Sequence, residues 1–220
     1  MDGATAGDES SWTESFVYMM KKLCLRNELM QDKTASSTAK QRLLIKSPVH
    51  TARIPLLRRL FPKAKFIYIH RHPDEVLLSM AHMLDTTYWY CYLNTPSNEQ
   101  IQEFILWQFE HMWYKYDSAA VSSAITSANK TSKTREREIS EDIFEICYDT
   151  TTSHLKQSIQ DIYGHIGITW TDALDVHFLA EESLLKSYCP NVHNESLLND
   201  DIKTLIRDRW GGYFDAFGYK

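Results

Sequence analysis

Two side chains in the first half of the sequence, Arg71 and Ser79, have the types and spacing of an anion-binding pair. Arg71 follows the apolar run 66–69, and its guanidinium can hold a phosphate through two parallel hydrogen bonds. Ser79 shares a helical row with apolar neighbours, so its hydroxyl points inward and needs a polar partner. A phosphate on Arg71 would be one such partner. Two other arrangements stay open here: Ser79 can bond back to the carbonyl oxygen of Glu75, and Arg71 can pair with an acid.

A lysine and a histidine further upstream add a second cation and a candidate base. Lys46 closes the short apolar run 42–46, and its mobile ammonium group suits an anionic leaving group. His50 follows four residues later, beyond Pro48. A neutral imidazole at that position could take the proton of an attacking hydroxyl. The alternative is that His50 only caps the helix that starts nearby.

Strands and helices alternate around these residues. Three apolar runs predict buried strands, at residues 42–46, 65–71 and 143–148. Helical spacing and start signals predict helices at residues 11–30, 51–61, 73–92 and 99–124, and an amphipathic helix after Asp149. This alternation predicts an α/β fold with a parallel sheet and helices on both faces. Ligands of such folds bind beyond the carboxyl ends of the strands, where Lys46, Arg71 and Tyr148 are expected.

The bulk composition is that of a globular protein with a full core. The 220 residues predict a single domain over residues 11–220, preceded by a disordered lead-in over residues 1–10. The net charge of -5 and the pI near 6.0 argue against a general nucleic-acid binder, which would carry a broad basic surface. A small basic pocket for one anion is compatible with an acidic chain, because net charge describes no single site.

The sequence predicts neither a metal site nor a membrane span. The four cysteines are widely spaced and form no C-x-x-C pair, which argues against a zinc site and a disulfide framework. The histidines near the candidate residues have no metal-ligand spacing with acids. No run of eighteen apolar residues occurs. Localisation stays unknown, with the cytoplasm as the default and the Golgi as the alternative if an anchor lies outside this chain.

Longer motifs give these residues a family context. The segment LLIKSPVHTARIPLLRRLFPKAKFIYIHRHPDEVLLSM resembles the PAPS-dependent sulfotransferases, in the branch with a K-[SD]-P-x-H segment followed by F-P-x-A-x-F-I-x-x-x-R-x-P-x-x-V-x-x-S. The segments FEICYDTTTSHLKQSIQDIYGHIGI and RDRWGGYFDAFGY are similar to later parts of the same branch. The resemblance covers about residues 42–220, and the core at 46–79 is far more specific than its short pieces.

The resemblance implies a role for each candidate residue. Arg71 and Ser79 match the pair that binds the 3′-phosphate of the nucleotide, and Tyr148 matches a tyrosine near the adenine. Lys46 matches a strand-end lysine near the sulfuryl group or the leaving phosphate. His50 is the candidate general base for the acceptor hydroxyl. The implied cosubstrate is 3′-phosphoadenosine 5′-phosphosulfate (PAPS), which leaves as 3′-phosphoadenosine 5′-phosphate (PAP), with no metal ion.

Two departures from the family pattern shape the functional expectation. His72 stands where the family usually has aspartate. Sulfotransferases also bind the 5′-phosphosulfate with a P-R-[ST]-G-T-T-like loop between a first strand and its helix, and nothing before Lys46 matches that loop. We therefore expect a sulfotransferase-like, P-loop-related fold that lacks its first βα unit. Without those backbone donors, we expect this chain alone to be weakly active or inactive.

Two function classes follow from this reading. The first is an enzyme that transfers a sulfuryl group from PAPS to a hydroxyl or amine of a small-molecule, glycan or lipid acceptor. The second is a non-catalytic homologue that binds 3′-phosphoadenosine or a partner. A kinase or NTPase ranks last, because no G-x-x-x-x-G-K-[ST] loop is present. The sequence identifies neither the acceptor nor the oligomeric state.

Overall fold

The computed structural model describes residues 5–30, 42–121, 137–185, 193 and 195–220. The chain divides into two compact units, residues 1–46 and 47–220, and each is described by itself. The first unit contains helix α1 (Ala6–Met30). This helix begins five residues before the predicted start, so part of the lead-in predicted as disordered is helical. The single domain predicted over residues 11–220 stays a prediction.

The segment before the second unit is not the strand that its apolar residues predict. Residues 42–47 have no regular secondary structure, and the side chain of Leu44 is 87% exposed. A strand needs a neighbour for its backbone groups, and no described strand pairs with this segment. The prediction of a buried strand at 42–46 is therefore wrong, and Lys46 does not stand at a strand end.

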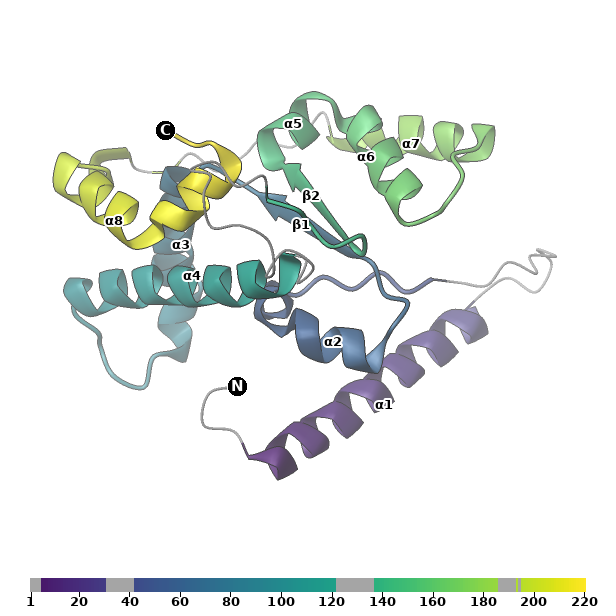
Figure 1. Ribbon diagram of the computed structural model, residues 1–220, viewed down its shortest axis with the longest axis horizontal. Coiled ribbons are helices and arrows are strands. Elements are labelled where there is room, and N and C mark those ends of the chain that lie inside the picture. Colours follow the sequence, from purple (N-terminus) through teal and green to yellow (C-terminus); the bar gives the residue numbers. More distant parts are fainter. Residues whose placement is uncertain (1–4, 31–41, 122–136, 186–192, 194) are drawn as a thin grey trace, which may run out of the picture. The chain divides into compact units, whose positions relative to one another are not determined.

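Two parallel strands form the sheet that the structure describes in the second unit (Figure 1). Strand β1 (Phe66–His70) pairs with β2 (Ile143–Cys147), in a register that runs from Phe66 opposite Ile143 to His70 opposite Cys147. The strands predicted at 65–71 and 143–148 are thus confirmed. Both carboxyl ends lie at one edge, as the parallel arrangement requires. This edge carries Arg71 and Tyr148 as the next residues.

Helices make up most of the remaining described chain. After the 3-10 turn η1 (Pro48–Arg53) they are α2 (Ile54–Leu60), α3 (Pro73–Thr86), α4 (Asn98–Ala120), α5 (Tyr148–Ser153), α6 (Leu155–His165), α7 (Asp172–Leu185) and α8 (Asp200–Phe217), with short 3-10 turns η2 (Tyr88–Cys91) and η4 (Glu195–Leu197). An α/β fold with a parallel sheet is confirmed. The missing first βα unit stays a prediction.

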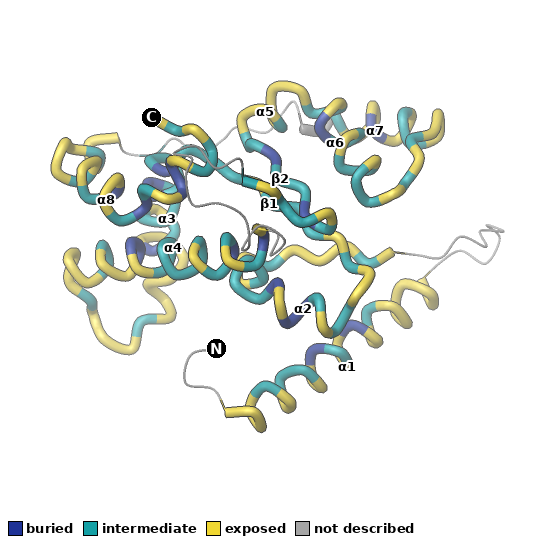
Figure 2. Tube along the Cα trace, viewed as in Figure 1, coloured by how far each residue is buried: buried dark blue, intermediate teal, exposed yellow. Residues whose placement is uncertain are grey.

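One of two buried hydrophobic clusters described in the second unit lies between α3, α4 and α8. Seven buried apolar side chains pack together there: Leu77, Leu84, Ile105, Leu106, Ile206, Trp210 and Phe214. The indole N–H of Trp210 donates to the carbonyl oxygen of Leu106 at 3.1 Å, which links α8 to α4. Figure 2 shows buried positions on these helices and on α2. This packing holds α8 against the elements that flank β1.

Candidate functional site

Arg71 is the first residue after β1 and the best-placed cation at the carboxyl end of the sheet. Its Nε donates to the carboxylate of Glu75, four residues later. Its guanidinium carbon lies 4.6 Å from the centre of the Tyr148 ring, which adds a cation–π contact. The Arg71 side chain is 32% exposed, so solvent and dissolved ligands reach it. The pairing of Arg71 with an acid, the alternative to phosphate binding that the sequence left open, is therefore present.

Glu75 occupies only one edge of the guanidinium. The terminal nitrogens Nη1 and Nη2 of Arg71 make no hydrogen bond with any residue that the structure describes. A guanidinium has five N–H donors, so four of them stay available. The two terminal nitrogens form the planar fork that matches a phosphate.

Ser79 lies on the same side of α3 as Glu75, one turn further along. The four-residue spacing places its Cα about 6 Å beyond that of Glu75 along the helix axis. Ser79 is half-buried, and within the described part of the chain its hydroxyl has no hydrogen bond. The back-bond from Ser79 to the Glu75 carbonyl, open from sequence alone, is not formed. A half-buried hydroxyl without a partner suits a ligand oxygen.

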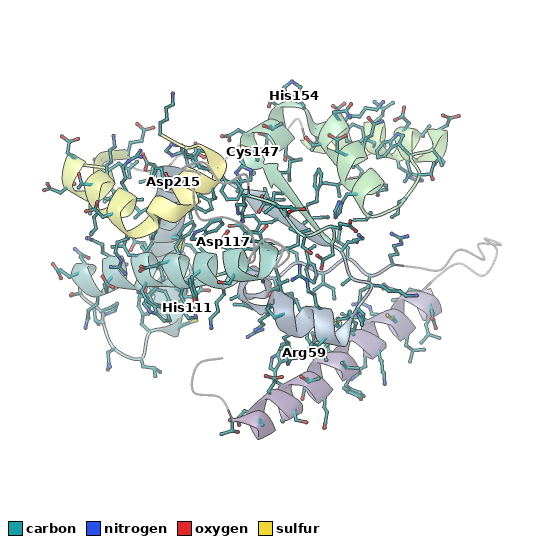
Figure 3. The ribbon with its side chains drawn as sticks, viewed as in Figure 1. Arg59, His111, Asp117, Cys147, His154 and Asp215 are labelled. Carbon is teal, nitrogen blue, oxygen red and sulfur yellow. The ribbon has the colours of Figure 1, made fainter. Side chains whose placement is uncertain are left out.

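Tyr148 is brought to Arg71 by the strand pairing. Cys147 pairs with His70 in the register, so the residues that follow each strand meet at the same edge. Tyr148 also begins helix α5. Figure 3 labels Cys147 at this end of β2. The structure thus joins two of the predicted site residues, Arg71 and Tyr148, which lie far apart in the sequence.

His50 and Lys46 are on other elements. His50 belongs to η1, which packs against α4. Burial and the charge of Arg53 lower the pKa of His50 below its usual 6.5, so its imidazole is neutral at neutral pH. Lys46 is the last residue of the first unit, and its assignment to the sulfuryl group or the leaving phosphate stays a prediction. The roles of all five residues stay predictions.

Two residues that contact Arg71 were missed by reasoning from sequence. Glu75 had a local signal, since an acid four residues after an arginine is a favourable helical pair. Tyr213 had no such signal. Its hydroxyl accepts the backbone N–H of Arg71 at 3.0 Å and donates to the Arg71 carbonyl oxygen at 2.9 Å. It comes from α8, at a sequence separation of 142 residues.

Two histidines next to Arg71 have structural partners. The Nδ1 atom of His72 accepts the backbone N–H of Asp74 at 3.3 Å and so caps α3, a role that an aspartate performs equally well. His70 forms a 2.7 Å hydrogen bond with the hydroxyl of Tyr219. Burial, assisted by the charge of Arg137, lowers the pKa of His70 to about 4. His70 is therefore neutral near pH 7.

Three other features of the described residues bear on the search for a site. Among them, no group of three His, Cys, Asp or Glu side chains is arranged to hold a metal ion. A search of the described helices found none long and apolar enough to span a bilayer. A surface pocket is lined by Glu99, Gln100, Glu103, Phe104 and Trp107. All five belong to α4, and none of the candidate residues lines it.

Comparison with known proteins identifies the family of this chain. The chain is 23% identical, over 177 residues, to omega-hydroxy-beta-dihydromenaquinone-9 sulfotransferases of Mycobacterium bovis and Mycobacterium tuberculosis. That region covers 80% of this chain and 41% of each relative, so the chain spans less than half the length of these relatives. No solved structure matches the chain. The model of the family described as "Sulfotransferase family" matches residues 14–172, and the chain therefore belongs to the sulfotransferase family.

Proposed function

We propose that this chain binds PAPS and, with low activity as this chain alone, transfers its sulfuryl group to a hydroxyl or amine of a small-molecule acceptor. The observation that supports the proposal is the state of Arg71. One edge of its guanidinium is anchored by Glu75, its face rests on Tyr148, and its terminal nitrogens have no hydrogen bond within the described chain. An arginine oriented in this way at the carboxyl end of a parallel strand is a preorganised phosphate receptor.

Arg71 and Ser79 together fit the 3′-phosphate of the nucleotide. The fork of Nη1 and Nη2 takes two phosphate oxygens, and the Ser79 hydroxyl donates to a third. Tyr148, which adjoins Arg71, is assigned to the adenosine side of the same ligand. Each hydrogen bond to a charged group contributes about 1.5–3 kcal/mol, so the pair distinguishes a 3′-phosphorylated nucleotide from its dephosphorylated form.

His50 and Lys46 are assigned to the transfer step. The acceptor oxygen attacks the sulfur of PAPS, the bond from sulfur to the 5′-phosphate oxygen breaks, and PAP leaves with the bonding electrons. His50 takes the acceptor proton, for which its lowered pKa makes the neutral imidazole available. The resemblance assigns Lys46 to the sulfuryl group or the leaving phosphate, and this role stays a prediction because Lys46 belongs to the first unit.

A hydroxyl is the acceptor group best supported. The mycobacterial relatives are named for an omega-hydroxylated menaquinone, which suggests an acceptor hydroxyl on an apolar molecule for this chain as well. Amines, glycans and other small alcohols stay within the proposal. The comparison extends over 41% of each relative, so activity and acceptor both have to be measured on this protein.

Isothermal titration with PAP tests the proposal most directly. We expect the wild type to bind PAP, and Arg71→Ala to weaken binding at least tenfold, because it removes charge-assisted bonds to the phosphate. Arg59→Ala is the matched control. Arg59 is an exposed arginine on α2, labelled in Figure 3 away from Cys147 at the strand ends, so we expect PAP binding to be unchanged.

Three outcomes separate the two function classes. Binding of PAP, together with transfer of radiolabelled sulfate from PAPS to a hydroxylated quinone or a simple alcohol, supports the enzyme. PAP binding that depends on Arg71 but gives no transfer to any acceptor supports the non-catalytic nucleotide binder. Absence of PAP binding to the wild type, or equal binding by wild type and Arg71→Ala, overturns the assignment of this site.

A further inference from the structure

The backbone of Arg71 lies just beyond the sheet, where its polar groups lose their strand partner. The register ends at His70 and Cys147, so the N–H and C=O of Arg71 have no place in the described ladder. Partly buried backbone groups need other partners. Both find the same atom, the hydroxyl oxygen of Tyr213, at 3.0 and 2.9 Å. The hydroxyl of Tyr213 thus accepts one hydrogen bond from Arg71 and donates another to the same residue.

Tyr213 itself is held rigidly. Its side chain is 1% exposed, and the rings of Phe109, Trp113 and Phe217 meet it edge-on with centroids 4.9–5.0 Å away. Edge-to-face pairs at this distance are favourable and directional. Burial raises the pKa of Tyr213 to about 12, so the hydroxyl keeps the proton that it donates to Arg71.

The local sequence of α8 explains how Tyr213 reaches this position. The helix has non-helical backbone angles at Trp210, and two glycines follow before Tyr213. A Cβ atom on Gly212 would lie 3.4 Å from Nε1 of Trp113, an ordinary van der Waals distance, so α8 packs closely on α4 at this point. The non-helical backbone at Trp210 thus lies one helical turn before the buried phenol of Tyr213.

We propose that Tyr213 is a positioning residue for the 3′-phosphate: it fixes the backbone of Arg71, so that the guanidinium fork faces the phosphate beside Ser79. The inference rests on the proposed function of Arg71 and adds to it the element that holds the arginine in place. Glu75 and Tyr148 orient the guanidinium end of the Arg71 side chain, whereas Tyr213 fixes the backbone from which that side chain extends. Together they limit the rotational freedom that Arg71 would lose on binding.

The test replaces Tyr213 with phenylalanine, which keeps the ring and removes both hydrogen bonds. We expect Tyr213→Phe to weaken PAP binding about five- to tenfold, while binding of adenosine 5′-phosphate, which has no 3′-phosphate, changes less than twofold. In an Arg71→Ala background, Tyr213→Phe should weaken PAP binding no further. A merely structural role would weaken the binding of both nucleotides alike.

Tyr116→Phe is the matched control, since Tyr116 is equally buried and its hydroxyl donates to Glu145 rather than to Arg71. We expect it to leave PAP affinity within twofold of the wild type. Amide hydrogen exchange gives a readout that needs no ligand. Exchange at Arg71 should accelerate at least tenfold in Tyr213→Phe and stay unchanged in Tyr116→Phe.

The outcomes distinguish failure of this inference from failure of the proposed function. If the wild type binds PAP and Tyr213→Phe binds it equally well, the positioning role is overturned. If the wild type does not bind PAP, the proposed function fails. If amide exchange at Arg71 is the same in Tyr213→Phe as in the wild type, the positioning role is overturned as well. If Tyr213→Phe does not fold, Phe217→Leu, which removes one supporting ring, should weaken PAP binding two- to threefold. Unchanged binding by Phe217→Leu then overturns the inference.

Discussion

Arg71 and Arg137 are two arginines of the same unit that differ in how many acids they bind and in how exposed they are. Arg137 donates to both carboxylate oxygens of Glu145, at 2.6 and 2.8 Å, and to Asp117 at 2.9 Å. Its guanidinium also lies within 6 Å of three aromatic rings, those of Trp113, Tyr116 and Phe217. Its remaining Nη2 atom is buried with no hydrogen-bond partner among the described residues, so a dissolved ligand cannot reach it.

Arg71 is paired far less completely. It has one carboxylate and one ring, its side chain is twice as exposed as that of Arg137 (32% against 16%), and its terminal nitrogens are accessible. The difference shows that location at a sheet does not by itself make an arginine a ligand receptor. The number of acids around an arginine and the exposure of its remaining donors decide, because the donors that the carboxylates of Asp117 and Glu145 leave over on Arg137 are buried.

The largest expected effect concerns Arg137. Arg137→Met leaves the carboxylate of Glu145, 16% exposed, without its cation, and we expect a loss of about 3 kcal/mol in the free energy of unfolding. Urea denaturation measures it. Arg71→Met is the matched control, and it should cost less than about 1 kcal/mol because its acid partner is half exposed. Equal losses of unfolding free energy for Arg137→Met and Arg71→Met would contradict the distinction between the two arginines.

The next effect is a pH dependence. His70 binds a proton near pH 6.5 in the unfolded chain but only near pH 4 when folded. The unfolded state therefore takes up more protons in this window, and stability falls as the pH drops from about 6.5 towards 4. After allowance for solvent screening of a half-buried ring, we expect a loss of about 1–2 kcal/mol.

Replacement of His70 by glutamine should remove that loss and flatten the stability profile over this range. Urea midpoints measured between pH 4 and pH 7 give the comparison. His154→Gln serves as the control, because His154 is exposed at the end of α5 (Figure 3) and should leave the slope unchanged. A slope for His70→Gln identical to that of the wild type would show that His70 does not cause it.

A smaller effect is expected at Tyr116, in the network of Arg137. Its hydroxyl donates to Glu145 at 2.7 Å, and burial raises the pKa of Tyr116, so it stays protonated. Tyr116→Phe removes one of several bonds to a carboxylate that remains paired with Arg137, and we expect a cost of about 1 kcal/mol in thermal or urea unfolding. A cost as large as that of Arg137→Met would mean that the phenol, and not the arginine, holds Glu145.

The smallest effect belongs to the acid beside Arg71. Glu75→Gln keeps an oxygen that accepts from Nε of Arg71 and removes only the charge of an exposed helical pair. We expect less than about 0.5 kcal/mol of destabilisation in urea. Glu145→Gln is the counterpart in the saturated network and should cost several times more. If both substitutions cost the same, the two arginines do not differ in their dependence on acids.

Local sequence signals predicted the parts of the molecule that depend on neighbours in the chain. The apolar runs around Ile67 and Ile146 formed the two paired strands, and Pro73 with the acids after it started α3. Arg71 followed β1 as predicted, because a strand that ends at a helix start must place the next residue at the sheet edge. The run 42–46 had a similar composition and formed no strand, since composition does not supply a pairing partner.

Only the tertiary structure decided which distant groups meet. The amino-acid sequence by itself determined the type and local order of β1, Arg71 and α3, through hydrophobic periodicity and helix-start chemistry that act over a few residues. The packing of α8 on α4 decided that Tyr213 holds the Arg71 backbone across 142 positions, and strand pairing decided that Tyr148 lies under its guanidinium. Such contacts follow from how whole faces pack together, and no short stretch of residues carries that information.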